Sequence, residues 1–221
     1  MKKMLAPLPS RATALPWLST LFLLAATACG GGGGDDSAAP PPPAPAPGLP
    51  TIAPAVNLDD NHQVGVNSTY WTDGGTATGS TVQGVPCTAP VDTFHIHSHL
   101  SIIVNGTAQA IAANAGIIDT ASLDCHYYIH THDRSGKLHV EAPAAGTFTL
   151  GQFFAIWGQP LTSTNVAGVT NMPRTVYITE SGHVTEFTGD PATIALQSHR
   201  HIAIVLGTAI TQVPFFNWTA D

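Results

Sequence analysis

Apolar and polar side chains alternate most regularly over residues 94–105. The apolar positions are Phe94, Ile96, Leu100, Ile102 and Val104. The positions between them carry His95, His97, His99, Ser101 and Asn105. Because successive side chains of a strand point to opposite faces of the sheet, this pattern predicts a strand with one hydrocarbon face and one imidazole face. Asn105-Gly106, a frequent two-residue hairpin turn, is expected to end the strand.

A second unit repeats this division of the two faces. Residues 127–132 and 137–141 read as a hairpin closed by the polar segment 133–136. In a symmetric register His130 lies opposite His139, and directly opposed residues have Cβ atoms about 5 Å apart. Further short strands are expected at residues 174–179, 183–187, 193–197 and 201–206.

One segment is expected to be helical. Thr149 and Gln152 have the spacing of a capping box, and Gly158 follows the apolar run 150–157. The chain is therefore predicted to be mainly β, an antiparallel β-sandwich or barrel-like domain with one short helix. The aromatic residues Phe215, Phe216 and Trp218 would either close the core or form an exposed edge.

The first fifty-five residues differ from the rest in composition. An apolar run of about fifteen residues follows a basic start, too short to span a bilayer and typical of a signal peptide. Its end, Ala-Thr-Ala-Cys-Gly at residues 26–30, resembles the lipobox of bacterial lipoproteins, with Ala26 where leucine is usual. The resemblance implies a signal peptide at residues 1–28 and lipidation of Cys29. A Gly- and Pro-rich disordered tether at 29–55 and a His-rich β-domain at 56–221 would follow. The alternative is an ordinary cleaved secretory signal followed by a disordered tail.

Charge limits the classes of partner. Charged residues make up 10% of the chain, far below the roughly 25% of an average soluble domain. The 14 acidic side chains exceed the 7 lysines and arginines, which argues against nucleic-acid binding. Cleavage before Cys29 would leave four basic side chains and a formal charge of −10, which suits a bound cation.

With Cys29 lipidated, Cys87 and Cys125 remain as a pair in an oxidising compartment, where a disulfide is the default. Closing this loop would stabilise the fold by roughly 3–4 kcal/mol on the chain-entropy model. The alternative is that Cys125 is a thiolate metal ligand beside His126.

Histidines outnumber lysines and arginines, 11 to 7. Alternate histidines on a strand share one face at intervals of about 6.5–7 Å, from which they can converge on an ion. The predicted metal ligands are His95, His97, His99, His130, His132 and His139. Neutral imidazole suits transition metals, whereas Ca²⁺ and Mg²⁺ prefer oxygen. Without a methionine-rich segment or a free thiol, Cu(II) and Zn are the leading ions.

The remaining polar candidates are less specific. Asp133 either orients an imidazole or starts a turn, and Glu141 either does the same or acts as a general base on metal-bound water. His126, His199 and His201 could form a second site. His62 and His183 are expected at the surface.

Three motifs occur together: HIHSHL at residues 95–100, HTHD with HVE at 130–141, and FTLGQFF with WG at 148–158. In this combination the chain resembles an uncharacterised family of exported microbial proteins. The resemblance implies that these segments form one module, and it carries no activity.

Three hypotheses about function follow. The leading one is an exported, lipid-anchored protein, facing the periplasm or cell surface, that binds a transition metal for acquisition, buffering or delivery. The second is a metal-dependent hydrolase or oxygen-using enzyme with three histidine ligands and Glu141 as acid/base. The third is a non-catalytic sandwich that binds a protein partner or glycan through its aromatic C-terminus.

Overall fold

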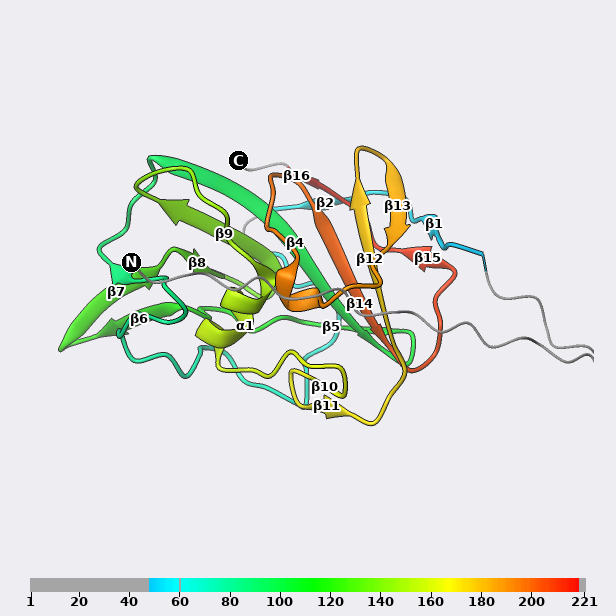
Figure 1. The fold of residues 1–221 in the computed structure, drawn as a ribbon, viewed down its shortest axis with the longest axis horizontal. Helices are drawn as coiled ribbons and strands as arrows, with labels where there is room; N and C mark the ends of the chain where they lie inside the picture. Colours follow the sequence, from blue (N-terminus) through cyan, green and yellow to red (C-terminus); the bar gives the residue numbers. More distant parts are fainter. Residues whose placement is uncertain (1–47, 60, 219–221) are drawn as a thin grey trace, which may run out of the picture. The chain divides into compact units, whose positions relative to one another are not determined.

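The structure is a computed structural model, and it describes residues 48–59 and 61–218. Its largest element is a seven-stranded sheet (Figure 1). The strands of this central sheet are β4 (Phe94–Val104), β5 (Thr107–Gln109), β8 (Ile129–His130), β9 (Lys137–Ala142), β12 (Arg174–Glu180), β13 (His183–Glu186) and β14 (His201–Leu206). Their order is β13-β12-β14-β4-β9-β8, with β5 also paired to β4. Only the β14–β4 pair of this sheet is parallel.

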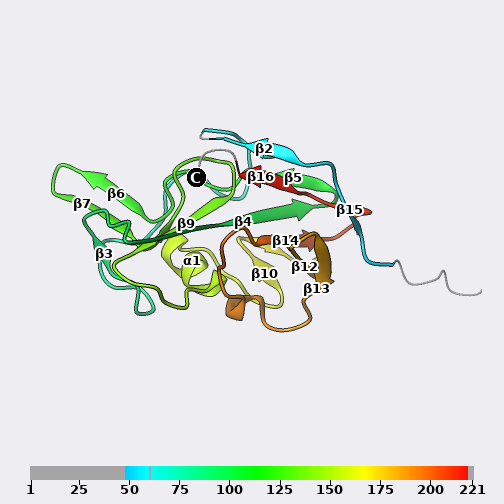
Figure 2. The ribbon, with the colours of Figure 1, turned by 90° about the horizontal axis from the view of Figure 1, so that it is seen from above.

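Smaller elements lie around the central sheet, on its faces and at its ends (Figure 1 and Figure 2). They are β1 (Thr51–Ile52), β2 (Val56–Leu58), β3 (Cys87–Thr88), β6 (Ile117–Thr120), β7 (Leu123–Tyr127), β10 (Asn165–Val166), β11 (Val169–Thr170), β15 (Gln212–Val213), β16 (Phe216–Trp218), helix α1 (Leu150–Trp157) and the 3-10 turn η1 (Pro191–Thr193). Figure 2 shows β2 and β16 on one side of β4, with α1 on the other. The domain is mainly β, mostly antiparallel and sandwich-like, as the sequence predicts.

The apolar face of the central sheet forms the main core. Leu100 and Ile102 of β4 are buried there beside Leu138 of β9. Helix α1 covers them with Phe153 and Trp157, which are also buried. The alternation along residues 94–105 therefore identified the face that packs against the helix.

Helix α1 has the bounds that the sequence predicts. The Thr149 side chain accepts a hydrogen bond from the Gln152 backbone N–H, and the Gln152 side chain accepts one from the Thr149 backbone N–H. Gly158 ends the helix with φ of 80°, a left-handed conformation that glycine adopts without steric cost. Both predicted helix signals are thus present.

The β4–β5 hairpin turn also follows the prediction. Asn105 and Gly106 have φ of 48° and 82°, and Val104 pairs with Thr107 across the two-residue loop. Two successive positive φ values are the mark of a type I′ turn, whose twist matches that of the flanking strands.

The predicted strand at residues 193–197 is replaced by a different arrangement. Pro191–Thr193 forms the 3-10 turn η1, and Ala195 makes only an isolated bridge with Thr149. The backbone N–H of Leu150 donates to the carbonyl of Ile194. This segment therefore holds the start of α1 and does not extend a sheet.

The N-terminal end of the domain pairs with its C-terminal end. Thr51–Ile52 runs parallel to Gln212–Val213, although the composition of the sequence predicts a tether up to residue 55. Ile52 packs against a second apolar group on the other face of the sheet, beside Ile103 and Val205. That apolar contact explains why the described fold reaches upstream of Val56.

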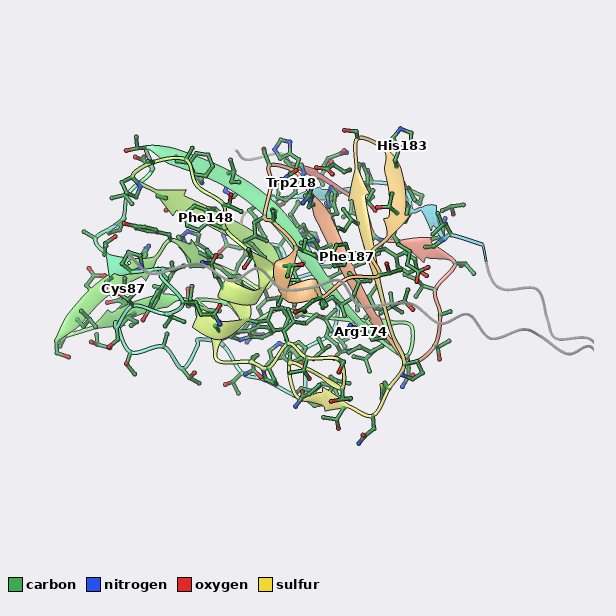
Figure 3. All side chains as sticks on the ribbon, in the orientation of Figure 1. Cys87, Phe148, Arg174, His183, Phe187 and Trp218 are labelled. Atoms are coloured by element: carbon green, nitrogen blue, oxygen red, sulfur yellow. A yellow bond between two sulfur atoms is a disulfide. The ribbon has the colours of Figure 1, made fainter. Side chains whose placement is uncertain are left out.

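Cys87 and Cys125 form the predicted disulfide, at the edge of the molecule where Figure 3 labels Cys87. It joins β3 to β7, the strand that precedes β8 and His130. The predicted signal peptide, the lipidation site Cys29 and most of the tether lie outside the described residues. Among the described residues, no helix combines the length and apolar character needed to span a membrane.

Candidate metal centre

The strand register brings histidines from three strands to one face of the central sheet. On the β4–β9 pair, His97 lies opposite His139 and His95 opposite Glu141. On the β8–β9 pair, His130 lies opposite His139, which is the predicted pairing. This is the sheet face opposite the main core, because the odd-numbered residues of β4 point away from Leu100 and Ile102.

The ring nitrogens of these histidines converge. Nε2 of His97 lies 3.0 Å from Nε2 of His95 and 2.9 Å from Nδ1 of His139. Nε2 of His130 lies 3.2 Å from Nε2 of His132. Two nitrogens bound to one ion at 2.0–2.1 Å are about 2.9 Å apart at a right angle and about 3.4 Å apart at a tetrahedral angle. The nitrogens are therefore already near the spacing of metal ligands.

Glu141 places a carboxylate among these nitrogens. Its Oε1 lies 3.4 Å from Nε2 of His95, 3.4 Å from Nδ1 of His139 and 3.8 Å from Nε2 of His130. We call the set His95, His97, His130, His132, His139 and Glu141 the imidazole cluster.

Two groups within the imidazole cluster could each hold a metal ion. In the first, one donor atom from each of His130, His132, His139 and Glu141 lies within 4.8 Å of all the others. In the second, the same is true of His95, His97 and His139. Five of the six predicted histidine ligands belong to these groups, together with Glu141.

Hydrogen bonding and burial keep the inner histidines in the form that binds metals. Nδ1 of His130 lies 2.8 Å from the carbonyl oxygen of Tyr127, and since a carbonyl only accepts, Nδ1 carries the hydrogen. Nε2 of His130 therefore holds a lone pair directed at the cluster.

Burial, followed by the nearby histidines His97 and His132, lowers the pKa of His139 to about 2. Burial also lowers the pKa of His130 to about 3, so both rings are neutral at neutral pH.

Two histidines of the imidazole cluster are exposed to solvent. The His95 side chain is 42% exposed, and His132 is also exposed. His97 and His130 are buried below them. An ion could thus reach the inner nitrogens from solvent past His95 and His132, which are themselves candidate ligands.

His99, the sixth predicted ligand, lies outside both groups. It is fully buried, and its Nε2 donates to the carbonyl oxygen of Ser135, 2.8 Å away. The ring of Phe216 lies over it, with centroids 4.1 Å apart. Burial and the neighbouring His201 lower its pKa to about 3.

The C-terminal aromatic residues cover this end of the imidazole face. Trp218, labelled in Figure 3, stacks on His199 with ring centroids 5.0 Å apart and lies 5.4 Å from the ring of His201. Its ring is also 6.2 Å from that of His97. We call His99, His201, Phe215, Phe216 and Trp218 the aromatic half of the face. No local sequence signal indicated where these aromatic rings would lie.

The less specific candidates divide between the two ends. The ring of His126 lies 5.2 Å from that of His130, and its buried Nδ1 has no hydrogen-bond partner among residues 48–59 and 61–218. His199 and His201 lie with the aromatic rings. His62 pairs with Asp59 at 3.5 Å, and His183 is exposed.

Asp133 builds the turn before β9. Its Oδ1 accepts from the Ser135 backbone N–H at 2.8 Å, and its Oδ2 accepts from that of Asn61 at 2.6 Å. Gly136 follows with φ of 85°, and a Cβ there would meet the Leu100 carbonyl oxygen and strain the turn. These contacts hold the backbone between His132 and His139 close to β4.

Two pockets of the described chain lie away from the imidazole cluster. Pockets of about 490 and 370 Å³ flank Trp71 and Asp73, and no histidine lines either of them.

No protein-family model, no curated protein and no solved structure matches this chain.

Proposed function

We propose that this chain is an exported, lipid-anchored protein that binds a transition metal through the imidazole cluster, for acquisition, buffering or delivery. The convergence of His130, His132, His139 and Glu141 within 4.8 Å carries the proposal. The fold brings together buried histidines that could hold a metal ion. Export of the chain and the identity of the ion are proposed in addition.

The donor chemistry supports Cu(II) or Zn. Imidazole nitrogens with one carboxylate suit either ion, whereas Ca²⁺ and Mg²⁺ require mostly oxygen ligands. Cys87 and Cys125 are joined to each other, so neither offers the thiolate that a blue-copper site or a cysteine-rich zinc site needs.

The position of Glu141 favours a metal-binding protein over a metal-dependent enzyme. Its Oε1 is within 3.8 Å of three ring nitrogens that point into the cluster. A carboxylate in this position serves as a ligand, whereas a general base must lie beside a metal-bound water.

The sequence alone supports the anchor, through the apolar run that ends at Ala28-Cys29. A Cys29→Ser variant expressed in a bacterial host is expected to leave the membrane fraction, and wild-type protein is expected to remain there. Retention of the variant in membranes would contradict the anchor without bearing on the metal site.

The metal site is tested by the metal content of purified protein. After loading with Cu(II) or Zn and desalting, wild-type protein should retain stoichiometric metal, and the double variant His97→Ala/His130→Ala should retain none. His183→Ala, which removes an exposed histidine on the β12–β13 hairpin, is the matched control. Equal metal content in the double variant and the control would overturn the proposal.

A further inference from the structure

The imidazole cluster contains more donors than one ion uses. A four-coordinate ion takes four ligands, and His130, His132, His139 and Glu141 already supply four. His95 and His97 are then left over, yet they converge with His139 in a group of their own.

The geometry around His97 favours an ion at this second group. Nε2 of His97 has two ring nitrogens as neighbours, at 3.0 Å in His95 and 2.9 Å in His139. A ring nitrogen carries either one hydrogen or one lone pair, so it can match only one of these neighbours as donor or acceptor. A cation between the three nitrogens would engage all three lone pairs together.

His139 lies between the two groups. Its Nδ1 lies 2.9 Å from Nε2 of His97, and its ring centroid lies 4.4 Å from that of His132. When its N–H proton is released to solvent on metal binding, the ring becomes an imidazolate with a lone pair on each nitrogen, and it can then bind one ion through each. The same ring is thus placed to serve both groups.

Glu141 occupies an equivalent place between the groups. Its Oε1 is 3.4 Å from Nε2 of His95, which belongs to the second group, and 3.8 Å from Nε2 of His130, which belongs to the first. A carboxylate has two oxygens and a negative charge. It can bind two cations and offset part of their repulsion.

We propose that the imidazole cluster holds a pair of transition-metal ions, one bound by His95 and His97 and the other by His130 and His132, with His139 and Glu141 shared between them. This inference rests on the proposed metal-binding function and adds its stoichiometry and its bridging ligands. Each ion has one exposed ligand, His95 or His132, through which it is loaded from solvent.

The test uses Cu(II) as probe on the purified chain, freed of metal with a chelator. Copper per chain is measured after loading and desalting, and the electron paramagnetic resonance signal is integrated against that copper. Wild-type protein should retain two coppers per chain with an integrated signal well below the copper content, because ions that share a ligand couple magnetically.

Variants separate the two ions. His95→Ala, which changes an exposed side chain, should retain one copper per chain with full signal intensity, and so should His132→Ala. His183→Ala should behave as wild type. Far-ultraviolet circular dichroism confirms that each variant is folded.

The outcomes separate this inference from the proposed function. One copper in wild-type protein would overturn the pair and leave the metal-binding function intact. No retained copper would overturn the pair, and retention of neither copper nor zinc would overturn both. Two coppers with full signal intensity would overturn the shared ligands. If His95→Ala and His132→Ala each still retained two coppers, neither histidine would be needed to bind an ion. That result would overturn the assignment of ligands to the two ions.

Discussion

The two ends of the imidazole face have the same sequence pattern and opposite surroundings. His95, His97 and His99 alternate along one strand and point to one side of the sheet. Around His97, β8 and β9 supply further ring nitrogens and a carboxylate. Around His99, β14 and β16 supply His201 and the rings of Phe216 and Trp218.

Neighbouring strands decide what a strand histidine does. His97 and His99 are both at least 95% buried, so burial does not distinguish them. His97 contacts nitrogens that can share an ion, and His99 donates to a backbone carbonyl beneath an aromatic ring. We interpret the first end as a binding site and the second as part of the packing that supports it.

The largest expected effect is on the aromatic half. Phe216 is buried, and its ring lies 4.1 Å from that of His99. Phe216→Ala should lower the free energy of unfolding by about 3–4 kcal/mol, because it removes a packed ring and leaves a cavity. Urea denaturation measures the change, and Val56→Ala, an exposed apolar change on the paired strand β2, is the control.

If the two ends are independent, folded Phe216→Ala protein keeps the copper content of wild type. A loss of copper in this variant would show that the aromatic half shapes the metal site, and it would contradict the independence of the two ends.

The next effect is acid destabilisation of the metal-free protein. Burial lowers the pKa of His99 to about 3 and that of His201 to about 4, against about 6.5 in the unfolded chain. Below pH 6.5 the unfolded chain binds protons that the folded chain does not, so stability is lost as the pH falls toward the folded values. At pH 5 each ring should cost about 2 kcal/mol relative to pH 7.

Urea titrations at pH 7 and pH 5 in the presence of chelator measure this loss. His201→Phe, which places an apolar ring among Phe215, Phe216 and Trp218, should make the loss smaller by up to about 2 kcal/mol. An unchanged pH dependence in this variant would contradict a neutral, buried His201.

The smallest effect distinguishes the two interpretations of Asp133. Its oxygens accept from two backbone N–H groups, so Asp133→Asn should cost about 1 kcal/mol of stability, through the loss of one acceptor. Copper content should not change, because Asp133 has no hydrogen bond to a cluster histidine among those the structure describes. Asp59→Asn is the exposed control. A lower copper content would instead support a role in orienting the imidazoles.

Local sequence patterns predicted the elements whose bounds are set by residues close together in the sequence, such as helix caps and turn residues. The bounds of α1 followed from the Thr149–Gln152 capping box and Gly158, and the β4–β5 hairpin followed from Asn105-Gly106. The pairing of His130 with His139 was predictable for the same reason, because a short turn sets the register of a hairpin.

Longer-range pairings could not be predicted in this way. His201 lies opposite His99 because β14 runs parallel to β4, and parallel neighbours have no connecting turn to set their register. The segment at residues 193–197 has the composition of a strand, but its backbone contacts the start of α1 instead. Both outcomes depend on contacts between distant parts of the chain.

The alternation of residue types predicts β-strands with an apolar face and an imidazole face, because side-chain direction follows from the two-residue period of a strand. Which histidines meet depends on how the strands pair in the folded domain. The pairing of β4 with β9 brought His97 to His139, and the placement of β16 put aromatic rings over His99. Strand order and layer packing depend on long-range contacts, and these contacts place His95 and His97 among the candidate metal ligands and His99 in the core.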